Sequence, residues 1–234
     1  VLSVDYYDIQ VDDYIGEFSP QEVLDGCYIG GDTVACSKIK RIGGDLTISG
    51  SGVELFTTNL KSRQVEGLEI NLDFSVDLGD MGQISFNANV NKYLTHEQQS
   101  SNESALIDCK GQFGTTCSPT SDLRWVQRTT WNLNDFTVSA LWRHMSSVDI
   151  QSDQIVDTFD QFQSIDSYDY IDLYASYHYG DHTKFTFGID NVFEKDAPVL
   201  GGEVGATSFN SGNTFPSTYD NLGRMFKAGV NFTF

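Results

Sequence analysis

Hydrophobic and polar residues alternate strictly in several stretches of the chain. Between residues 67 and 78 the even positions are apolar and the odd positions are polar or glycine. After a short glycine-containing segment the alternation resumes over 84–91. A period of two residues places apolar side chains on one face of a β-strand and polar ones on the other. Two such stretches across a short turn predict a β-hairpin.

The same alternation predicts about eight strands, separated by connections of two kinds. We expect strands near 1–11, 64–78, 83–94, 122–132, 136–145, 167–179, 183–192 and 223–234. Short turns alternate with long loops at 12–61, 95–121, 146–166 and 193–222, which hold all four prolines and all four cysteines. Outer-membrane barrels have short periplasmic turns and long outer loops. The predicted fold is therefore all-β: an antiparallel up-and-down transmembrane β-barrel segment over 1–234.

Two other folds are compatible with the alternation. One is a self-contained eight-stranded outer-membrane barrel with a structural or adhesion role, because eight strands can close on themselves. The other is a soluble secreted β-sandwich that works as a binding module. The unequal loops, and aromatic strand ends such as Trp142, Tyr177 and Phe232, favour the membrane barrel, since aromatic girdles lie at membrane interfaces.

Composition and motifs exclude several classes of function. The net charge of −19, from 14 Lys+Arg and 33 Asp+Glu, argues against a nucleic-acid partner. No window approaches eighteen consecutive apolar residues, so no transmembrane helix is expected. Motifs of hydrolases, zinc proteases and phosphate-binding loops are absent from the sequence, and its four histidines are scattered. We expect no enzyme activity, no cofactor and no metal site. The first residues lack the features of a signal peptide, so we expect a processed chain or a piece of a longer one.

The cysteines form two close pairs. Cys27 and Cys36 lie in the first long loop, and Cys109 and Cys117 lie in the second. Neither pair has the spacing of a zinc or redox site, so two local disulfides are the simplest prediction. They imply an oxidising compartment. Just before the first pair, the sequence from Ser19 to Glu22 has the form of a helix capping box, which predicts a short helix ending at Gly26.

Three stretches resemble TonB-dependent outer-membrane receptors. The segment NLKSRQVEGLE at 59–69 looks like the family's approach to a late barrel strand. The segment FGIDNVFEKDAP at 187–198 looks like its penultimate strand and the exit from it, and YDNLGR at 219–224 looks like the start of its last strand. Together with the strand pattern, the resemblance runs over nearly the whole chain.

The resemblance implies a function and a set of partners. A receptor of this family has a plug and a barrel of about twenty-two strands, so the chain looks like the last third of such a barrel. The whole receptor would take up a nutrient, such as an iron chelate or a carbohydrate, across the outer membrane of a Gram-negative bacterium. The implied partners are the membrane lipid, the missing plug and N-terminal barrel strands, the TonB system, the barrel-assembly machinery and a small-molecule substrate.

Aromatic residues in the long loops are the candidate ligand contacts. Their faces suit sugars and iron chelates, although each could equally pack one loop against another; they are Tyr28, Phe113, Phe159, Phe162, Phe209 and Phe215. The terminal Phe234 resembles the aromatic signal that the barrel-assembly machinery recognises, or else is a lipid-facing girdle residue.

Overall fold

The computed structural model describes residues 1–55, 57–101, 106–114, 116–200 and 214–234 of the 234-residue chain. Its contacts divide the chain into two compact units. One contains Val1–Tyr7, Glu66–Leu94 and Lys110–Phe234, and the other contains Asp8–Val65 and Thr95–Cys109.

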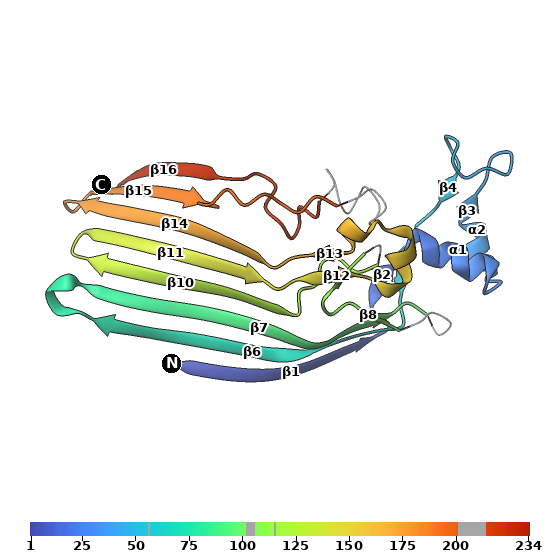
Figure 1. Cartoon of the computed structure of the whole chain (residues 1–234), viewed down its shortest axis with the longest axis horizontal. Helices are drawn as coiled ribbons and strands as arrows, with labels where there is room; N and C mark the ends of the chain where they lie inside the picture. The colour runs from blue at the N-terminus through green and yellow to red at the C-terminus, as the bar shows by residue number, and fades with distance from the viewer. Residues whose placement is uncertain (56, 102–105, 115, 201–213) are drawn as a thin grey trace. The chain divides into compact units, whose positions relative to one another are not determined.

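One antiparallel sheet contains all the long strands of the described residues, and it confirms the predicted fold class. In spatial order these strands are β1 (Leu2–Asp12), β6 (Ser62–Asp77), β7 (Gln83–Gln99), β10 (Leu123–Leu133), β11 (Phe136–Met145), β14 (Tyr168–Tyr179), β15 (Thr183–Asp190) and β16 (Met225–Phe232). Each of these long strands pairs with the long strands that precede and follow it along the chain, as in an up-and-down meander. Figure 1 shows β1 and β16 at the two edges. In the described part of the chain these two edges do not pair, so the sheet is open.

The short connections are tight turns between paired strands. A 3-10 turn, η1 (Gly79–Met81), joins β6 to β7, and it begins at Gly79 and is followed by Gly82, both with positive φ (62° and 84°). Such φ values suit glycine because it has no Cβ. Asn134, with φ of 50°, makes the β10–β11 turn. The β10–β11 turn leaves these two strands in continuous register from Arg124↔Met145 to Leu133↔Phe136.

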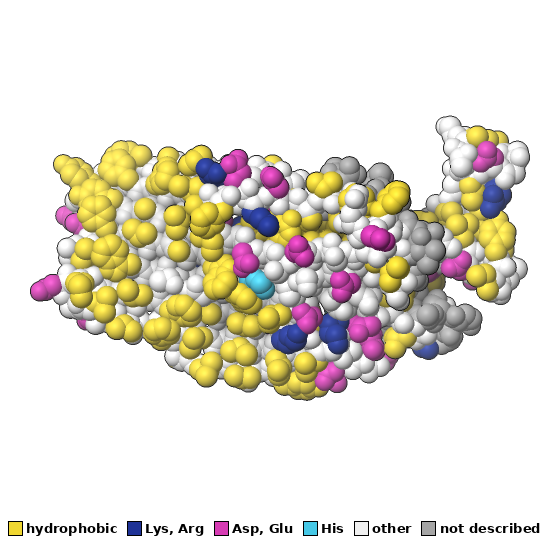
Figure 2. All heavy atoms as spheres, in the orientation of Figure 1, with side chains coloured by type: hydrophobic (Ala, Val, Ile, Leu, Met, Phe, Trp, Pro, Cys, Tyr) yellow, Lys and Arg dark blue, Asp and Glu magenta, His cyan; other side chains and the backbone are white. Residues whose placement is uncertain are grey.

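Within the described residues, no second layer covers the apolar face of the sheet. Phe226 is 65% exposed, and other apolar residues on this face are also exposed, including Val4, Phe74, Phe136, Val138, Phe187 and Val230. Figure 2 shows hydrophobic side chains gathered over the strands near their short turns. A β-sandwich buries this face against a second sheet. An exposed apolar face is instead what lipid-facing strands present.

Three of the long connections in the first unit share a small core. They contribute short strands, β9 (Gln112–Phe113), β12 (Val148–Ile150) and β13 (Ser164–Ile165), which form a sheet of their own in the order β13–β12–β9. The η2 (Ser152–Asp157) and η3 (Asp160–Phe162) turns lie in the same connection as β12 and β13. The residues of this core, which we call the loop core, include Phe113, Val148, Ile150, Ile165, Tyr170 and Phe215.

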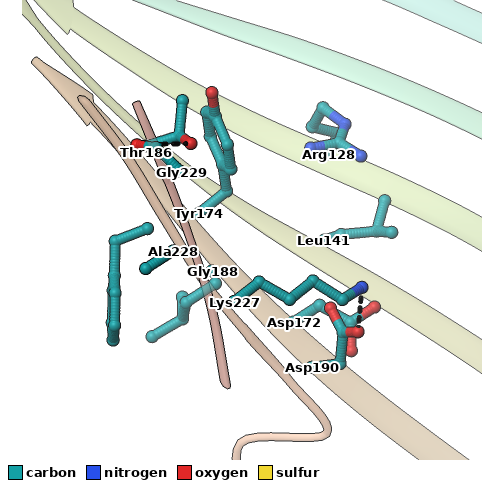
Figure 3. A pocket seen from close by; sticks show the side chains of 12 residues that line it. Arg128, Leu141, Asp172, Tyr174, Thr186, Gly188, Asp190, Lys227, Ala228 and Gly229 are labelled. Atoms are coloured by element: carbon teal, nitrogen blue, oxygen red, sulfur yellow. Dashed lines mark hydrogen bonds and ion pairs between the residues drawn. The ribbon is translucent and has the colours of Figure 1, made fainter. Parts of the chain in front are cut away.

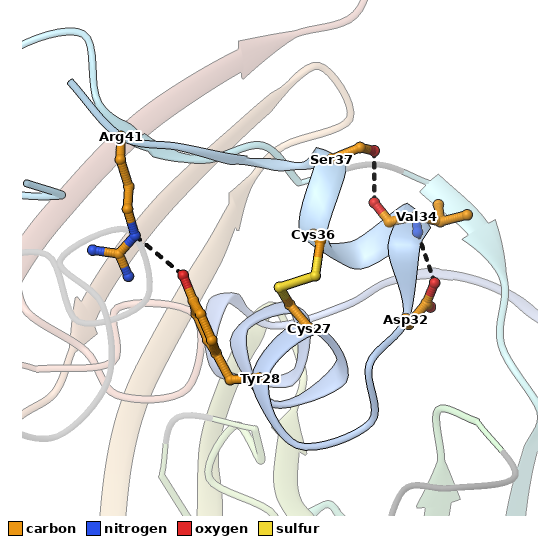
Figure 4. The surroundings of a disulfide bond; sticks show 7 residues. All are labelled: Cys27, Tyr28, Asp32, Val34, Cys36, Ser37 and Arg41. Atoms are coloured by element: carbon orange, nitrogen blue, oxygen red, sulfur yellow. Dashed lines mark hydrogen bonds between the residues drawn. A yellow bond between two sulfur atoms is a disulfide. The ribbon is translucent and has the colours of Figure 1, made fainter. Parts of the chain in front are cut away.

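The second unit contains a disulfide-linked pair of short helices. Helix α1 (Pro20–Tyr28) starts with the predicted capping box, in which Ser19 Oγ accepts from Glu22 N at 3.2 Å and Glu22 Oε2 accepts from Ser19 N at 2.7 Å. The predicted end at Gly26 is wrong, because the helix continues to Tyr28 and Ile29 N donates to Asp25 O. Helix α2 (Thr33–Ser37) follows, and Cys27 bonds to Cys36 as predicted (Figure 4).

Small strand pairs complete this unit. Strand β2 (Ile15–Glu17) pairs with β5 (Thr57–Asn59), β3 (Ile39–Lys40) pairs with β4 (Gly52–Val53), and β8 (Ile107–Asp108) pairs with the end of β7. Cys109 and Cys117 are also disulfide-bonded, and no cysteine among the described residues is free. The sequence predicted loops at these positions because elements of two or three residues show no periodicity.

Candidate functional site

The polar face of the main sheet brings charged side chains from non-adjacent strands together. Across β10, β11 and β14, the register pairs Arg128 with Leu141 and Leu141 with Asp172, and one step along it pairs Val126 with Arg143 and Arg143 with Tyr170. Alternation puts all these residues on the same face. The face is therefore a polar surface built by strand register.

A bidentate ion pair joins the middle of this face. Arg143 Nε and Nη2 donate to the two carboxylate oxygens of Asp172, each at 3.1 Å. Asp172 Oδ1 also accepts from Asn191 N at 2.8 Å, and the Arg143 guanidinium lies 5.1 Å from the centroid of the Tyr170 ring. Charge-assisted, two-point contacts of this kind fix geometry as well as adding energy. They hold β11, β14 and the end of β15 in one arrangement.

A hollow of about 380 Å³ opens beside this ion pair. Figure 3 shows Arg128 and Leu141 on one side of it, Tyr174 and Thr186 on another, and Lys227 next to Asp190. Lys227 and Asp190 form an ion pair across β15 and β16. The hollow is thus lined by both positively and negatively charged side chains, and most of these side chains form ion pairs.

Amide and carboxylate side chains cover the same face on β6 and β7. Asn89 Nδ2 donates to Glu69 Oε1 at 2.8 Å and lies 2.7 Å from Asn71 Oδ1, and Asn87 Nδ2 donates to Asp73 Oδ1. These hydrogen bonds connect neighbouring strands through side chains as well as through the backbone. A polar face of this kind suits an aqueous or protein-filled lumen.

Residues 1–192 match the sequence profile of the β-barrel domain described as "TonB dependent receptor-like, beta-barrel". The chain belongs to the TonB-dependent receptor family. The search of the curated proteins found no match.

Solved structures of TonB-dependent receptors have the same fold. The copper transporter OprC matches with a TM-score of 0.56 and 18% identity, over 100% of this chain and 28% of that one. A mutant of the ferric enterobactin receptor PfeA from Pseudomonas aeruginosa matches with a TM-score of 0.57 and 16% identity, over 100% and 29%. The siderophore receptor PirA from Acinetobacter baumannii gives 0.54 and 12%, over 100% and 29%. The chain therefore spans less than a third of these receptors, and the likeness shows the fold alone.

The predicted ligand-contact aromatics of this TonB-dependent receptor chain have unlike environments. Phe113 and Phe215 are buried in the loop core, with exposed fractions of 0% and 2%, and Phe162 packs against that core. Phe159 is 67% exposed. Tyr28, in the second unit, is exposed and its hydroxyl accepts from Arg41 Nε at 3.1 Å. The terminal Phe234 is exposed, and Phe209 lies outside the described residues.

Burial also alters the acidity of one loop tyrosine. Desolvation raises the pKa of Tyr219 well above its usual value, and the nearby positive charge of Arg124 opposes this rise only in part. The phenol is thus neutral and packs its ring 4.9 Å from that of Tyr168. Tyr219 contributes to the loop core rather than to proton transfer.

Two kinds of feature are absent from the described ranges. None of the helices there has the length and apolarity needed to cross a membrane. No group of three or more His, Cys, Asp or Glu side chains there is arranged to hold a metal ion.

Arg124 and Arg128 were not among the residues predicted to lie on the polar face. The sequence does contain a signal for this placement, because Arg124 and Arg128 occupy even positions of β10, as does the polar Thr130, and alternation puts these positions on one face. It was obscured by Gln127 and Thr129, polar residues on the other parity, which made this the least regular of the predicted strands.

Proposed function

We propose that this chain is the last part of the barrel of an outer-membrane receptor that takes up a nutrient. Its apolar face would contact the membrane lipid, and its polar face would line the lumen. The single observation that supports this most directly is the sheet with one exposed apolar face and one ion-paired polar face. The family match over residues 1–192 supports it independently.

The open edges of the sheet support a larger protein. Unpaired backbone groups at a lipid-exposed edge are very costly, so β1 and β16 need partner strands. We infer that the remaining strands and a plug come from other parts of the same receptor, and that the plug contacts the TonB system, which supplies the energy. The barrel-assembly machinery would insert the whole chain, with Phe234 as part of the signal it recognises.

The loop core supports a substrate site in the outer half of the receptor. Loops that are fixed by Phe113 and Phe215 lose less conformational entropy when a ligand binds. We propose that exposed groups beside this core, such as Phe159, contact the substrate. Iron–siderophore complexes and copper are the first candidates, because the ferric enterobactin receptor and the copper transporter share the fold.

Two measurements test the proposal. The first is the mass of the native protein in outer-membrane fractions, detected with an antibody to the 109–117 loop. A mass several times the 26.0 kDa of this chain supports a large receptor. A band at 26.0 kDa that shifts on boiling would instead indicate a small closed barrel and overturn the transport proposal.

The second measurement is uptake. Cells lacking the receptor gene should lose accumulation of one labelled compound from a panel of ferric siderophores and copper. The same loss should follow when the TonB system is inactivated. Uptake that is independent of the TonB system would contradict the proposed mechanism even if the receptor is large.

A further inference from the structure

Three arginines form a row on the polar face of β10 and β11. Arg124 and Arg128 share one face of β10, with Val126 between them, and Arg143 of β11 pairs with Val126. Same-face neighbours along a strand are about 6.8 Å apart. Along the strand direction the three arginines are therefore evenly spaced, in the order Arg124, Arg143 and Arg128, from the loop end of the sheet towards its middle. It gathers three of the six arginines of a chain whose net charge is −19.

The three guanidinium groups differ in their partners. Arg143 is neutralised by Asp172, and Arg124 Nη2 donates to the carbonyl oxygen of Pro119 at 2.7 Å. Arg128 Nη1 donates to the hydroxyl of Ser139 at 2.9 Å, which leaves its charge uncompensated. Within the described residues Arg128 has no ion pair. The nearby carboxylates of Asp172 and Asp190 are already paired, to Arg143 and to Lys227.

Space is available next to Arg128. Arg128 lines the hollow of about 380 Å³, and Gly188 and Gly229 also line it. A Cβ added at Gly188 would have no neighbouring atom closer than 3.7 Å, whereas one added at Gly229 would lie 2.9 Å from Thr186 Oγ1, so the lining is open at Gly188 and close at Gly229. Tyr174 and Thr186, labelled in Figure 3, add hydroxyl groups to the wall. The hollow can hold a group of a few atoms beside the guanidinium.

We propose that Arg128 is an oxyanion-binding residue that receives a carboxylate or a similar group in this hollow. A guanidinium presents five N–H donors in a planar fork that fits two oxygens of one anion, and Ser139 occupies only one of them. The inference rests on the proposed function in one respect, namely that the polar face lines the lumen. The anion has two possible sources: an acidic side chain from the part of the receptor outside this chain, or an anionic group on the transported compound.

Chemical modification of the full-length receptor in outer-membrane vesicles tests the assignment. Phenylglyoxal reacts with accessible arginines, and peptide mass spectrometry measures the rate at each site. Arg41, an exposed guanidinium bound to the Tyr28 hydroxyl and Gly44 O, is the unprotected reference. Arg143, paired with Asp172, is the protected one. Each rate is measured without added anion and with inorganic phosphate or citrate.

The two sources give different results, and both support the proposal. A substrate site is modified readily without anion and is protected about tenfold when phosphate or citrate occupies nine-tenths of it. A carboxylate from elsewhere in the receptor makes Arg128 as slow as Arg143 without any added anion. In that case Arg128→Gln also lowers the thermal stability of the receptor, and Arg128→Lys, which keeps the charge but loses the fork, restores only part of it.

Two results would overturn the proposal. One is modification of Arg128 at the rate of Arg41 with no effect of phosphate or citrate. The other is slow modification combined with an unchanged stability of the Arg128→Gln receptor, because Arg128 would then be merely covered. The assay needs no transport. A receptor that imports nothing can still protect Arg128, and a negative result at Arg128 leaves the uptake role intact.

Discussion

Phe113 and Phe215 meet edge to face, with their ring centroids 6.3 Å apart, although they come from two different long connections. Both are almost completely buried. A third connection contributes Val148 and Ile150 to the same cluster, and the side-chain oxygen of buried Gln151 accepts hydrogen bonds from the backbone N–H groups of Thr116 and Cys117, each at 3.0 Å. These long loops are thus fastened to one another and form a fixed structure.

Phe113→Ala should loosen these loops without unfolding the strands. Removing a fully buried phenylalanine side chain costs about 3–5 kcal/mol, because it loses the transfer free energy and leaves a cavity. We expect faster protease cleavage and faster amide exchange over 146–166, with little change in β10 and β11. The matched control is Phe159→Ala, since Phe159 is 67% exposed and its loss should change stability by less than about 0.5 kcal/mol. Equal effects of the two substitutions would contradict the assignment of Phe113 to the core.

Gly67→Ala should impair assembly of the first strands. A Cβ at this position would overlap the Tyr7 side chain and would lie 2.6 Å from Lys92 O. The glycine in the family-like segment 59–69 therefore permits close packing of Tyr7 over β6. Overpacking of this kind costs about 1–3 kcal/mol. The measurement is the heat-dependent mobility shift of the full receptor, which reports the folded barrel.

A second substitution separates the two clashes at Gly67. Tyr7→Ala combined with Gly67→Ala relieves the contact with the aromatic side chain but leaves the one with the Lys92 carbonyl. We therefore expect partial recovery of the folded form. Gly188→Ala is the control, because the nearest atom to its added Cβ is 3.7 Å away. An equally severe defect at Gly188 would show that any loss of a strand glycine is harmful, independent of Tyr7.

The alternation of residues was sufficient to predict the long strands because each has one apolar and one polar face. Strand β10 is the informative exception. Gln127 and Thr129 lie on the same parity as Trp125, yet Gln127 Nε2 donates to Thr129 Oγ1 at 2.7 Å, so the two polar groups partly satisfy one another. The strand is therefore kept by pairing with β7 and β11 despite its weaker pattern.

The loop core and the arginine row could not be predicted in the same way. Phe113, Ile150 and Phe215 are brought together by tertiary packing of short elements that show no periodicity in sequence. Arg143 was visible as a polar-face residue, but its neighbours depend on which strands pair and in which register. The sequence predicts faces of strands, whereas a site on a sheet is made across strands.

The Cys27–Cys36 disulfide should stabilise the α1–α2 segment locally. It closes a loop with a sequence separation of 9, for which the chain-entropy relation gives about 2–3 kcal/mol. Cys27→Ser with Cys36→Ser should increase amide exchange and protease cleavage over 19–40 and leave β10 to β16 unchanged. Mild reduction of the native protein should have the same local effect. A global loss of the folded barrel in the double variant would contradict this local role.

Alkaline pH should weaken the loop core through Tyr219. Because burial raises the pKa of this phenol, the folded state holds its proton at pH values where the unfolded chain, with a tyrosine pKa of about 10, releases it. Its contribution is complete below about pH 10 and is lost as the pH rises from there, by at most about 1.4 kcal/mol per pH unit for one proton.

The measurement is protease cleavage of the 146–166 loop between neutral pH and about pH 11.5. Tyr219→Phe cannot ionise at this position and should flatten the alkaline part of the profile, whereas Tyr28→Phe, a change at an exposed side chain, should leave it unaltered. Phenolate absorbance gives a second measurement. In Tyr219→Phe, the number of tyrosines that stay protonated at alkaline pH should be one lower than in the native protein. An alkaline profile that is identical in Tyr219→Phe and the native receptor would show that the buried phenol does not control the loop core.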